Sequence, residues 1–128
     1  EESGSIQHVL SREELLEMRH IVRMVPLAPH VREYAVQLVL ATHPENSDGG
    51  LSKKYIRYGS SPRGAQALIL GGKVRALLDG RFNVSQDDIR ALLLPALRHR
   101  ILLNFEAQAD SRTPDDLLEE IARTATKR

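Results

Sequence analysis

The segment Gly59–Gly64 (GSSPRG) places an arginine at the start of a predicted helix, directly after a long loop. Free backbone N–H groups and the dipole of a helix N-terminus together form an anion site. Arg63 takes the second helical position, where a cation is unfavourable by roughly a few tenths of a kcal/mol. A phosphate or carboxylate bound there would reverse that cost. The pattern therefore indicates either an anion site at Arg63 or an arginine that extends into solvent.

A second basic cluster, Arg98-His99-Arg100, follows Pro95 in a predicted helix. Consecutive residues on a helix diverge by about 100°, so the three side chains do not form one narrow patch. Two interpretations stay open. Either Arg98 and His99 face a partner while Arg100 flanks the core, or all three have a structural role.

Residues for other common chemistries are missing. The chain has no Cys, which excludes a disulfide framework, a thiolate nucleophile and a thiolate-bound metal. A phosphate-binding loop GxxxxGK and the motifs GxGxxG, HExxH and GxSxG are also absent. The histidines stand far apart and no pair is four residues apart, so we predict no metal site. Four of them are expected at the surface: His8, His20, His30 and His43.

Acidic pairs are frequent, and we expect them at helix N-termini or on exposed faces, where they complement the helix dipole. The pairs are Glu13-Glu14, Asp87-Asp88, Asp115-Asp116 and Glu119-Glu120.

The charge balance argues against a general nucleic-acid binder. The chain has fourteen Arg and four Lys against 17 acidic residues, so its net charge is +1. The 128 residues fit one domain, and 19 Leu with no Trp predict an aliphatic core. No apolar run is long enough to span a membrane and no signal peptide is visible, which predicts a cytoplasmic protein. Because the chain begins without Met, we expect a domain cut from a longer protein.

Capping and proline signals predict an all-α protein, a compact bundle of about five helices. Ser11 with Glu14, and Ser85 with Asp88, match the capping-box pattern. The expected helices cover residues 12–24, 29–43, 62–79 and 86–103, with a last one starting at 113. Residues 44–60 are expected to form a long flexible loop with a short extended piece at 55–58 and its most flexible point at Gly49-Gly50.

Two positions inside the predicted helices need an explanation. Gly71 and Gly72 should each cost about 1 kcal/mol relative to Ala, so they indicate either a close helix crossing or a helix stabilised by its neighbours. Pro95 removes the hydrogen bond to the carbonyl of Ala91, which predicts a kink in the fourth helix.

Four motifs, in this order, make the sequence resemble the C-terminal lid domain of MoxR-type AAA+ ATPases. They are the SPR helix start at 59–64, the V-x-x-D-D-I helix start at 84–89, the P-A-L-R-H-R segment at 95–100 and the FEAQA segment at 105–109. The resemblance covers about residues 9 to 123. The two central glycines and an insertion at 44–54 depart from the family pattern.

The resemblance implies a role for the SPR helix start. Arg63 is similar to the sensor-2 arginine, which reaches the γ-phosphate of ATP held mainly by a preceding α/β domain. Ser61 and Pro62 would complete this cofactor-binding helix start. The implied cofactor of the full-length protein is ATP with Mg²⁺, whereas residues 1–128 alone should hold no cofactor firmly. The phosphate-loop lysine and the acidic Mg²⁺ ligand of the family have no counterpart here, so the fragment alone should not hydrolyse ATP.

The family also implies a larger organisation. Residues 1–10 would link to an upstream ATPase core, residues 11–123 would form the lid, and residues 124–128 a tail. The full-length protein would form a homo-oligomeric ring, a hexamer, with a chaperone-like remodelling or metal-cofactor-insertion function. Proteins with von Willebrand factor A domains are implied partners, and nucleic acid is not.

Two other functions compete with this interpretation. One is a helix-turn-helix-like DNA-binding module with residues 86–94 as recognition helix, opposed by the net charge and by the acids at that helix start. The other is a helical protein-interaction module in which Arg63 has no role.

Overall fold

The computed structural model describes residues 7–46 and 50–125. Parts of the expected linker (1–6) and tail (126–128), as well as Gly49, lie outside the described residues. The elements in chain order are α1 (Arg12–Met24), α2 (Pro29–Leu40), the 3₁₀ turn η1 (Pro44–Asn46), α3 (Leu51–Tyr55), β1 (Ile56–Tyr58), α4 (Pro62–Leu78), α5 (Gln86–Ala91), α6 (Leu93–Leu97), β2 (Leu102–Leu103), α7 (Phe105–Ala109) and α8 (Pro114–Ala125).

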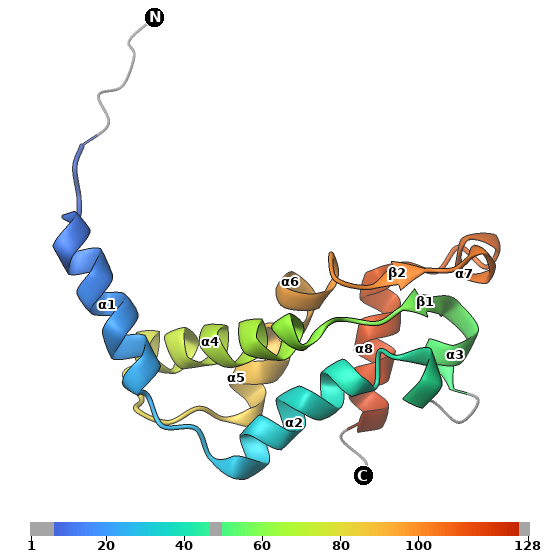
Figure 1. Ribbon diagram of the computed structural model, residues 1–128, viewed down its shortest axis with the longest axis horizontal. Helices are drawn as coiled ribbons and strands as arrows, with labels where there is room; N and C mark the ends of the chain where they lie inside the picture. The colour runs from blue at the N-terminus through green and yellow to red at the C-terminus, as the bar shows by residue number, and fades with distance from the viewer. Residues whose placement is uncertain (1–6, 47–49, 126–128) are drawn as a thin grey trace, which may run out of the picture.

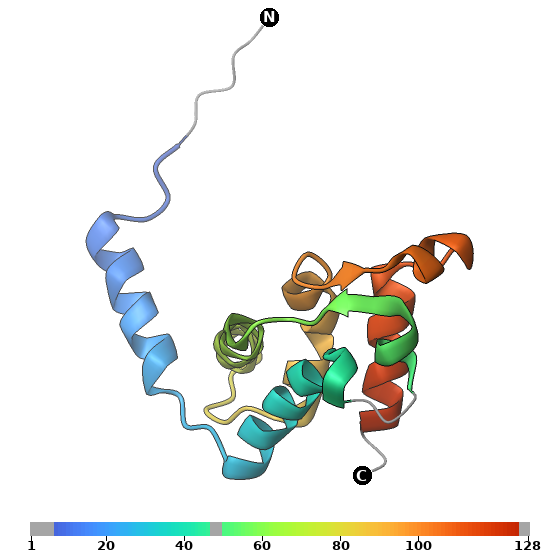
Figure 2. The same ribbon diagram turned by 45° about the vertical axis from the view of Figure 1, so that its right-hand side comes forward.

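Helix α1 begins as predicted and projects from the other helices, with its C-terminal end against α4 (Figures 1 and 2). The Ser11 side chain accepts from the Glu14 backbone N–H, and the Glu14 carboxylate accepts from the Ser11 N–H, which confirms the capping box. At the other end of α1, Lys73 of α4 donates to the Arg23 carbonyl at 3.0 Å. None of the residues of α1 is buried, and Leu15 is 52% exposed. The apolar side of this helix therefore lies open in the described chain.

Helices α2, α4, α5 and α8 surround the aliphatic core (Figure 2). Helix α2 turns one face to this core, where Val31, Tyr34, Ala35, Leu38 and the following Thr42 are all buried. The helix itself ends at Leu40, before the predicted boundary at 43. Helix α8 starts at Pro114 as expected and buries Leu117, Leu118 and Ile121. The predicted all-α class is confirmed, although the structure adds a small two-stranded sheet.

The two central glycines of α4 allow a close crossing with α5 and the residues beside it. A Cβ at Gly71 would stand 2.6 Å from Leu92 Cδ1, and one at Gly72 would stand 3.0 Å from Ile89 Cδ1. Both distances are too short for ordinary side-chain contact, so the close-crossing interpretation is confirmed. Gly80 follows the helix with φ +71°, in the left-handed region that glycine adopts readily.

The predicted loop at 44–60 is largely ordered, which corrects the sequence-based expectation. It contains η1, α3 and β1. Strand β1 confirms most of the extended piece expected at 55–58, and it pairs antiparallel with β2 through Ile56–Leu103 and Tyr58–Leu102. Helix α3 was missed because a five-residue helix shows no clear periodicity.

The fourth predicted helix is also wrong in its extent. The structure replaces one helix over 86–103 with α5, α6 and β2. The break falls at Leu92, with φ −98° and ψ 1°, rather than as a kink at Pro95. Pro95 instead occupies the third position of α6, where its missing N–H leaves no helical hydrogen bond unmade. Helix α7 begins after Asn104, whose side chain accepts from the Ala107 N–H. The described residues therefore form eight α-helices, not five.

None of the helices among the described residues is long and apolar enough to cross a membrane.

Candidate functional site

The predicted helix start at 59–64 connects β1 to α4 and lies next to the end of α2 (Figure 1). Ser60 is fully buried here, and its backbone N–H donates to Thr42 Oγ1 at 2.9 Å. The Thr42 hydroxyl in turn donates to the Val39 carbonyl at 2.6 Å. Thr42 thus fastens the segment before α4 to the last turn of α2.

His43 makes a second contact between the end of α2 and the segment before α4. Its Nε2 lies 2.8 Å from the Ser60 carbonyl oxygen, which can only accept, so this nitrogen donates. Its Nδ1 lies 3.1 Å from Glu45 Oε1. A backbone hydrogen bond within Glu45 and then the hydrogen bond to His43 lower the pKa of the Glu45 carboxyl. The prediction of a surface role for His43 is therefore wrong, because the imidazole is partly buried and joins two backbone segments.

Glycine is required at positions 59 and 64, on either side of these contacts. A Cβ at Gly59 would stand 2.8 Å from the ring of His43 and from the Thr42 carbonyl oxygen. A Cβ at Gly64 would stand 2.8 Å from Leu97 Cδ2 and would also strike the Ser60 side chain. The chain around the helix start is therefore held between α2 on one side and α6 on the other.

The three predicted site residues lie at the open side of this arrangement. Ser61, Pro62 and Arg63 are exposed, as the N-cap and the first two residues of α4. The Ser61 side chain makes no capping hydrogen bond. Among the described residues Arg63 has no ion-pair or side-chain hydrogen-bond partner. A fixed backbone thus presents a free guanidinium group and an uncapped helix N-terminus, an arrangement that can bind a phosphate group.

The Arg98-His99-Arg100 side chains separate, although they lie in the turn after α6 and not on a helix as predicted. Arg98 is exposed and donates to Asp115 Oδ2 at 2.8 Å, whereas Arg100 is partly buried and donates to the Ala96 carbonyl. His99 is exposed. The cluster does not reach Arg63 through any recorded contact and is not part of the helix start.

Asp88 lies at the start of α5, as expected, and its capping box with Ser85 is confirmed. Its burial was not predicted: it is 2% exposed and accepts from both terminal nitrogens of Arg81, at 2.7 and 2.9 Å. Hydrogen bonds from Arg81 hold its pKa well below the usual range, although burial raises it, and Ser85 adds to the lowering. Arg75 approaches at 3.6 Å. These contacts balance the acid and fix the start of α5, which indicates a structural role.

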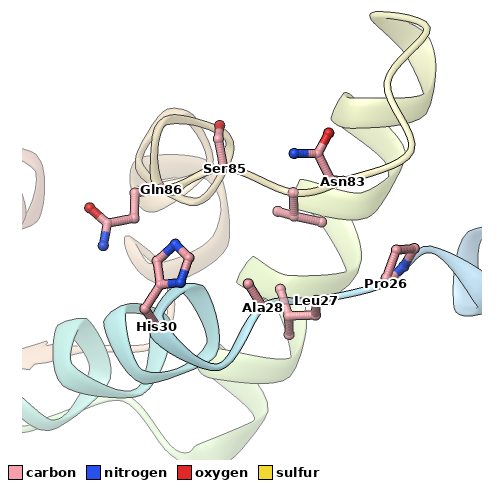
Figure 3. Close-up of a pocket in the computed structure, with 8 residues that line it drawn as sticks. Pro26, Leu27, Ala28, His30, Asn83, Ser85 and Gln86 are labelled. Carbon is pink, nitrogen blue, oxygen red and sulfur yellow. The ribbon is translucent and has the colours of Figure 1, made fainter.

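A pocket of about 650 Å³ lies at the other end of α4 (Figure 3). Pro26, Leu27 and Ala28 line one side, and His30 and Gln86 point toward one another across it. No predicted site residue lines this pocket. The described residues also contain no group of three or more His, Asp or Glu side chains that would hold a metal.

The chain is similar in sequence to known proteins over most of its length. The profile of the AAA lid domain family matches residues 50–121. Chaperone MoxR1 of Mycobacterium tuberculosis is 29% identical over 119 residues, which are 92% of this chain and 32% of that protein. Protein MoxR of Paracoccus denitrificans is 34% identical over 94 residues, which are 68% of this chain and 28% of that protein.

A solved structure extends the agreement to the fold. The crystal structure of a candidate ATPase from Cytophaga hutchinsonii superposes with a TM-score of 0.84 at 32% identity, over 91% of this chain and 36% of that one. The chain belongs to the AAA lid domain family, as a lid of the MoxR type. It spans about a third of the length of these relatives.

Proposed function

We propose that this chain is the nucleotide-sensing lid of a MoxR-like ATPase and that Arg63 is its sensor-2 arginine. The observation that supports this role is the free guanidinium of Arg63 on a helix start that is fixed by Thr42 and His43. A cation held by a rigid element is suited to stabilising charge at a phosphoryl group. Because Arg63 belongs to α4, a contact with nucleotide also orients the whole lid.

The cofactor in this proposal is ATP with Mg²⁺, bound mainly outside these 128 residues. Arg63 would contact the terminal phosphate, and the open N-terminus at Ser61 and Pro62 would border it. When bound, ATP supplies the phosphoryl group whose transfer to water drives the cycle. These residues provide no phosphate-binding loop and no acidic Mg²⁺ site, so residues 1–128 alone should release no phosphate.

The larger assembly belongs to the same proposal. Residues 1–10 link to an ATPase core, 11–123 form the lid and 124–128 a tail. The exposed apolar side chains of α1, such as Leu15 and Ile21, support a contact with that core. We further propose a cytoplasmic hexameric ring that remodels client proteins or inserts metal cofactors, with von Willebrand factor A domain proteins as partners and no nucleic-acid ligand. The relative named Chaperone MoxR1 supports a chaperone-like role.

The test uses the full-length protein that contains this chain. Arg63→Ala should lower steady-state phosphate release at least about tenfold while the protein still assembles, and Arg63→Lys should restore only part of the rate. Arg32→Ala is the matched control, because Arg32 is an exposed arginine of α2 away from the helix start. Wild-type turnover of Arg63→Ala would show that the sensor assignment is wrong.

The structure weakens the competing DNA-binding interpretation. Its proposed recognition helix is only six residues long, and Asp88 and Ile89 face the core. The exposed part of α5 is too short to contact bases in the major groove of DNA.

A further inference from the structure

A second concave site lies between α5, α6 and α8, separate from the SPR helix start. It has a volume of about 500 Å³. Arg90, Arg98 and Arg123 line it together with the apolar residues Leu94 and Pro95, and Glu119 is the one acid in its lining. We call this site the arginine pocket. A lining that combines cationic and apolar side chains is a feature of a binding site for an anionic ligand that also has an apolar part.

Two of the three guanidinium groups form no ion pair within the described residues. Arg98 pairs with Asp115 at 2.8 Å. Arg90 forms no ion pair with any of the described residues. Within residues 7–46 and 50–125, the Arg123 side chain makes one long hydrogen bond of 3.4 Å, from Nε to the carbonyl of Glu119 in its own helix. Glu119 forms no ion pair within the described part of the chain, so the pocket retains an excess of positive charge.

The surrounding helices give this pocket a fixed shape. Leu94 and Pro95 belong to α6, which is anchored by the buried Leu93 and Leu97 and packs against α8. Arg123 belongs to α8, which buries Ala122 beside it. These helices fix the backbone positions of the lining, and guanidinium groups favour paired contacts with carboxylates.

We propose that the arginine pocket binds an acidic peptide segment of a protein partner, with carboxylates on Arg90 and Arg123 and an aliphatic side chain over Leu94 and Pro95. Charge complementarity favours acidic side chains of the peptide. Contact with Leu94 and Pro95 favours a peptide over a simple anion. The proposal does not depend on the role of Arg63, because the pocket contains none of the residues of the helix start.

The experiment is a fluorescence anisotropy titration of the 128-residue chain with a labelled peptide that alternates paired glutamates with leucine. We expect saturable binding that weakens as NaCl rises from about 50 to about 300 mM. Peptides with Gln for every Glu, or Ser for every Leu, should each bind at least about fivefold more weakly.

Variants locate the site. The double variant Arg90→Gln/Arg123→Gln should weaken binding at least about fivefold, because it removes the two unpaired cations. Arg19→Gln/Arg32→Gln makes the same change of net charge at exposed arginines on α1 and α2, and it should alter binding less than about twofold. Circular dichroism of each variant checks that the helices remain, and these exposed substitutions should preserve them.

Four results would overturn the proposal. The first is the absence of saturable binding, and the second is equal weakening by the two double variants. The third is full affinity of the serine-substituted peptide, or full displacement by inorganic polyphosphate, either of which would reduce the pocket to an anion site. The fourth is tighter binding of a short RNA that the pocket variants abolish, which would assign the pocket to nucleic acid.

Discussion

His43 Nε2 donates to the carbonyl oxygen of Ser60 across 17 residues of sequence, at 2.8 Å. This bond joins the end of α2 to the segment that begins α4, two residues before the first helical residue. The position of the α4 N-terminus, and with it of Arg63, is therefore determined by side chains that do not touch a ligand. We regard Thr42 and His43 as positioning residues for the helix start.

Replacing His43 tests this relationship. His43→Ala leaves the Ser60 carbonyl without its partner, and we expect a loss of about 1–2 kcal/mol in the free energy of unfolding, measured by urea denaturation. His20→Ala is the control, since His20 is exposed on α1 and has no recorded bond. Equal losses in the two variants would show that the imidazole does not hold the helix start.

Gly64→Ala tests the packing on the opposite side. The new methyl group would meet Leu97 and the buried Ser60 together, and neither has free space to move into. We expect a loss of about 1–3 kcal/mol in the free energy of unfolding. Gly71→Ala should cost less, because its methyl meets only the end of the Leu92 side chain and alanine gains about 1 kcal/mol in helix propensity. The reverse order in thermal or urea unfolding would contradict this account.

Local signals in the sequence were sufficient for several elements. The caps at Ser11 and Ser85 and the proline–glycine boundaries of α4 each act within a few residues, so the starts of α1, α5 and α4 follow directly from the sequence. These features need no tertiary contact to specify them.

Contacts between distant residues account for what the sequence did not predict. His43 gains its role from Ser60, and Asp88 becomes a buried acid because Arg81 folds back onto it from the preceding turn. Neither partner is visible in a helical pattern. Helices α3 and α7 have five residues each, too few to show a period, and their ends are set by tertiary bonds such as that from Asn104 Nδ2 to the Lys54 carbonyl.

The Asp88–Arg81 pair predicts a pH dependence of stability. The pKa of Asp88 is lowered in the folded protein, chiefly by Arg81, so the pair contributes fully above the ordinary carboxyl pKa near 4. That contribution should decline as the pH falls below about 5, and it is lost fully only when the carboxyl protonates in the folded protein, well below its ordinary pKa. Asp88→Asn removes the charge, so we expect a loss of about 1–3 kcal/mol at pH 7 that shrinks toward pH 2. Urea denaturation across this pH range measures both effects.

Asp87→Asn is the matched control for that experiment. Asp87 is the neighbouring residue in the first turn of α5, but it is exposed and forms no recorded ion pair. Its replacement should change stability by less than about 0.5 kcal/mol at pH 7. A loss at Asp88→Asn that stays constant from pH 7 to pH 2 would mean that the acid contributes by packing rather than by its charge.

The last prediction concerns what Arg63 does in the isolated chain. One guanidinium and one helix N-terminus offer few contacts to a nucleotide, so ATP should bind weakly, with a dissociation constant of about 1 mM or higher. In an NMR titration with Mg²⁺-ATP, the amide shifts of residues 61–65 should change most, and Arg63→Ala should remove the change. Because Arg63 is exposed and unpaired, that substitution should alter the free energy of unfolding by less than about 0.5 kcal/mol. Tight, saturable binding of ATP would instead mean that these 128 residues contain a complete nucleotide site.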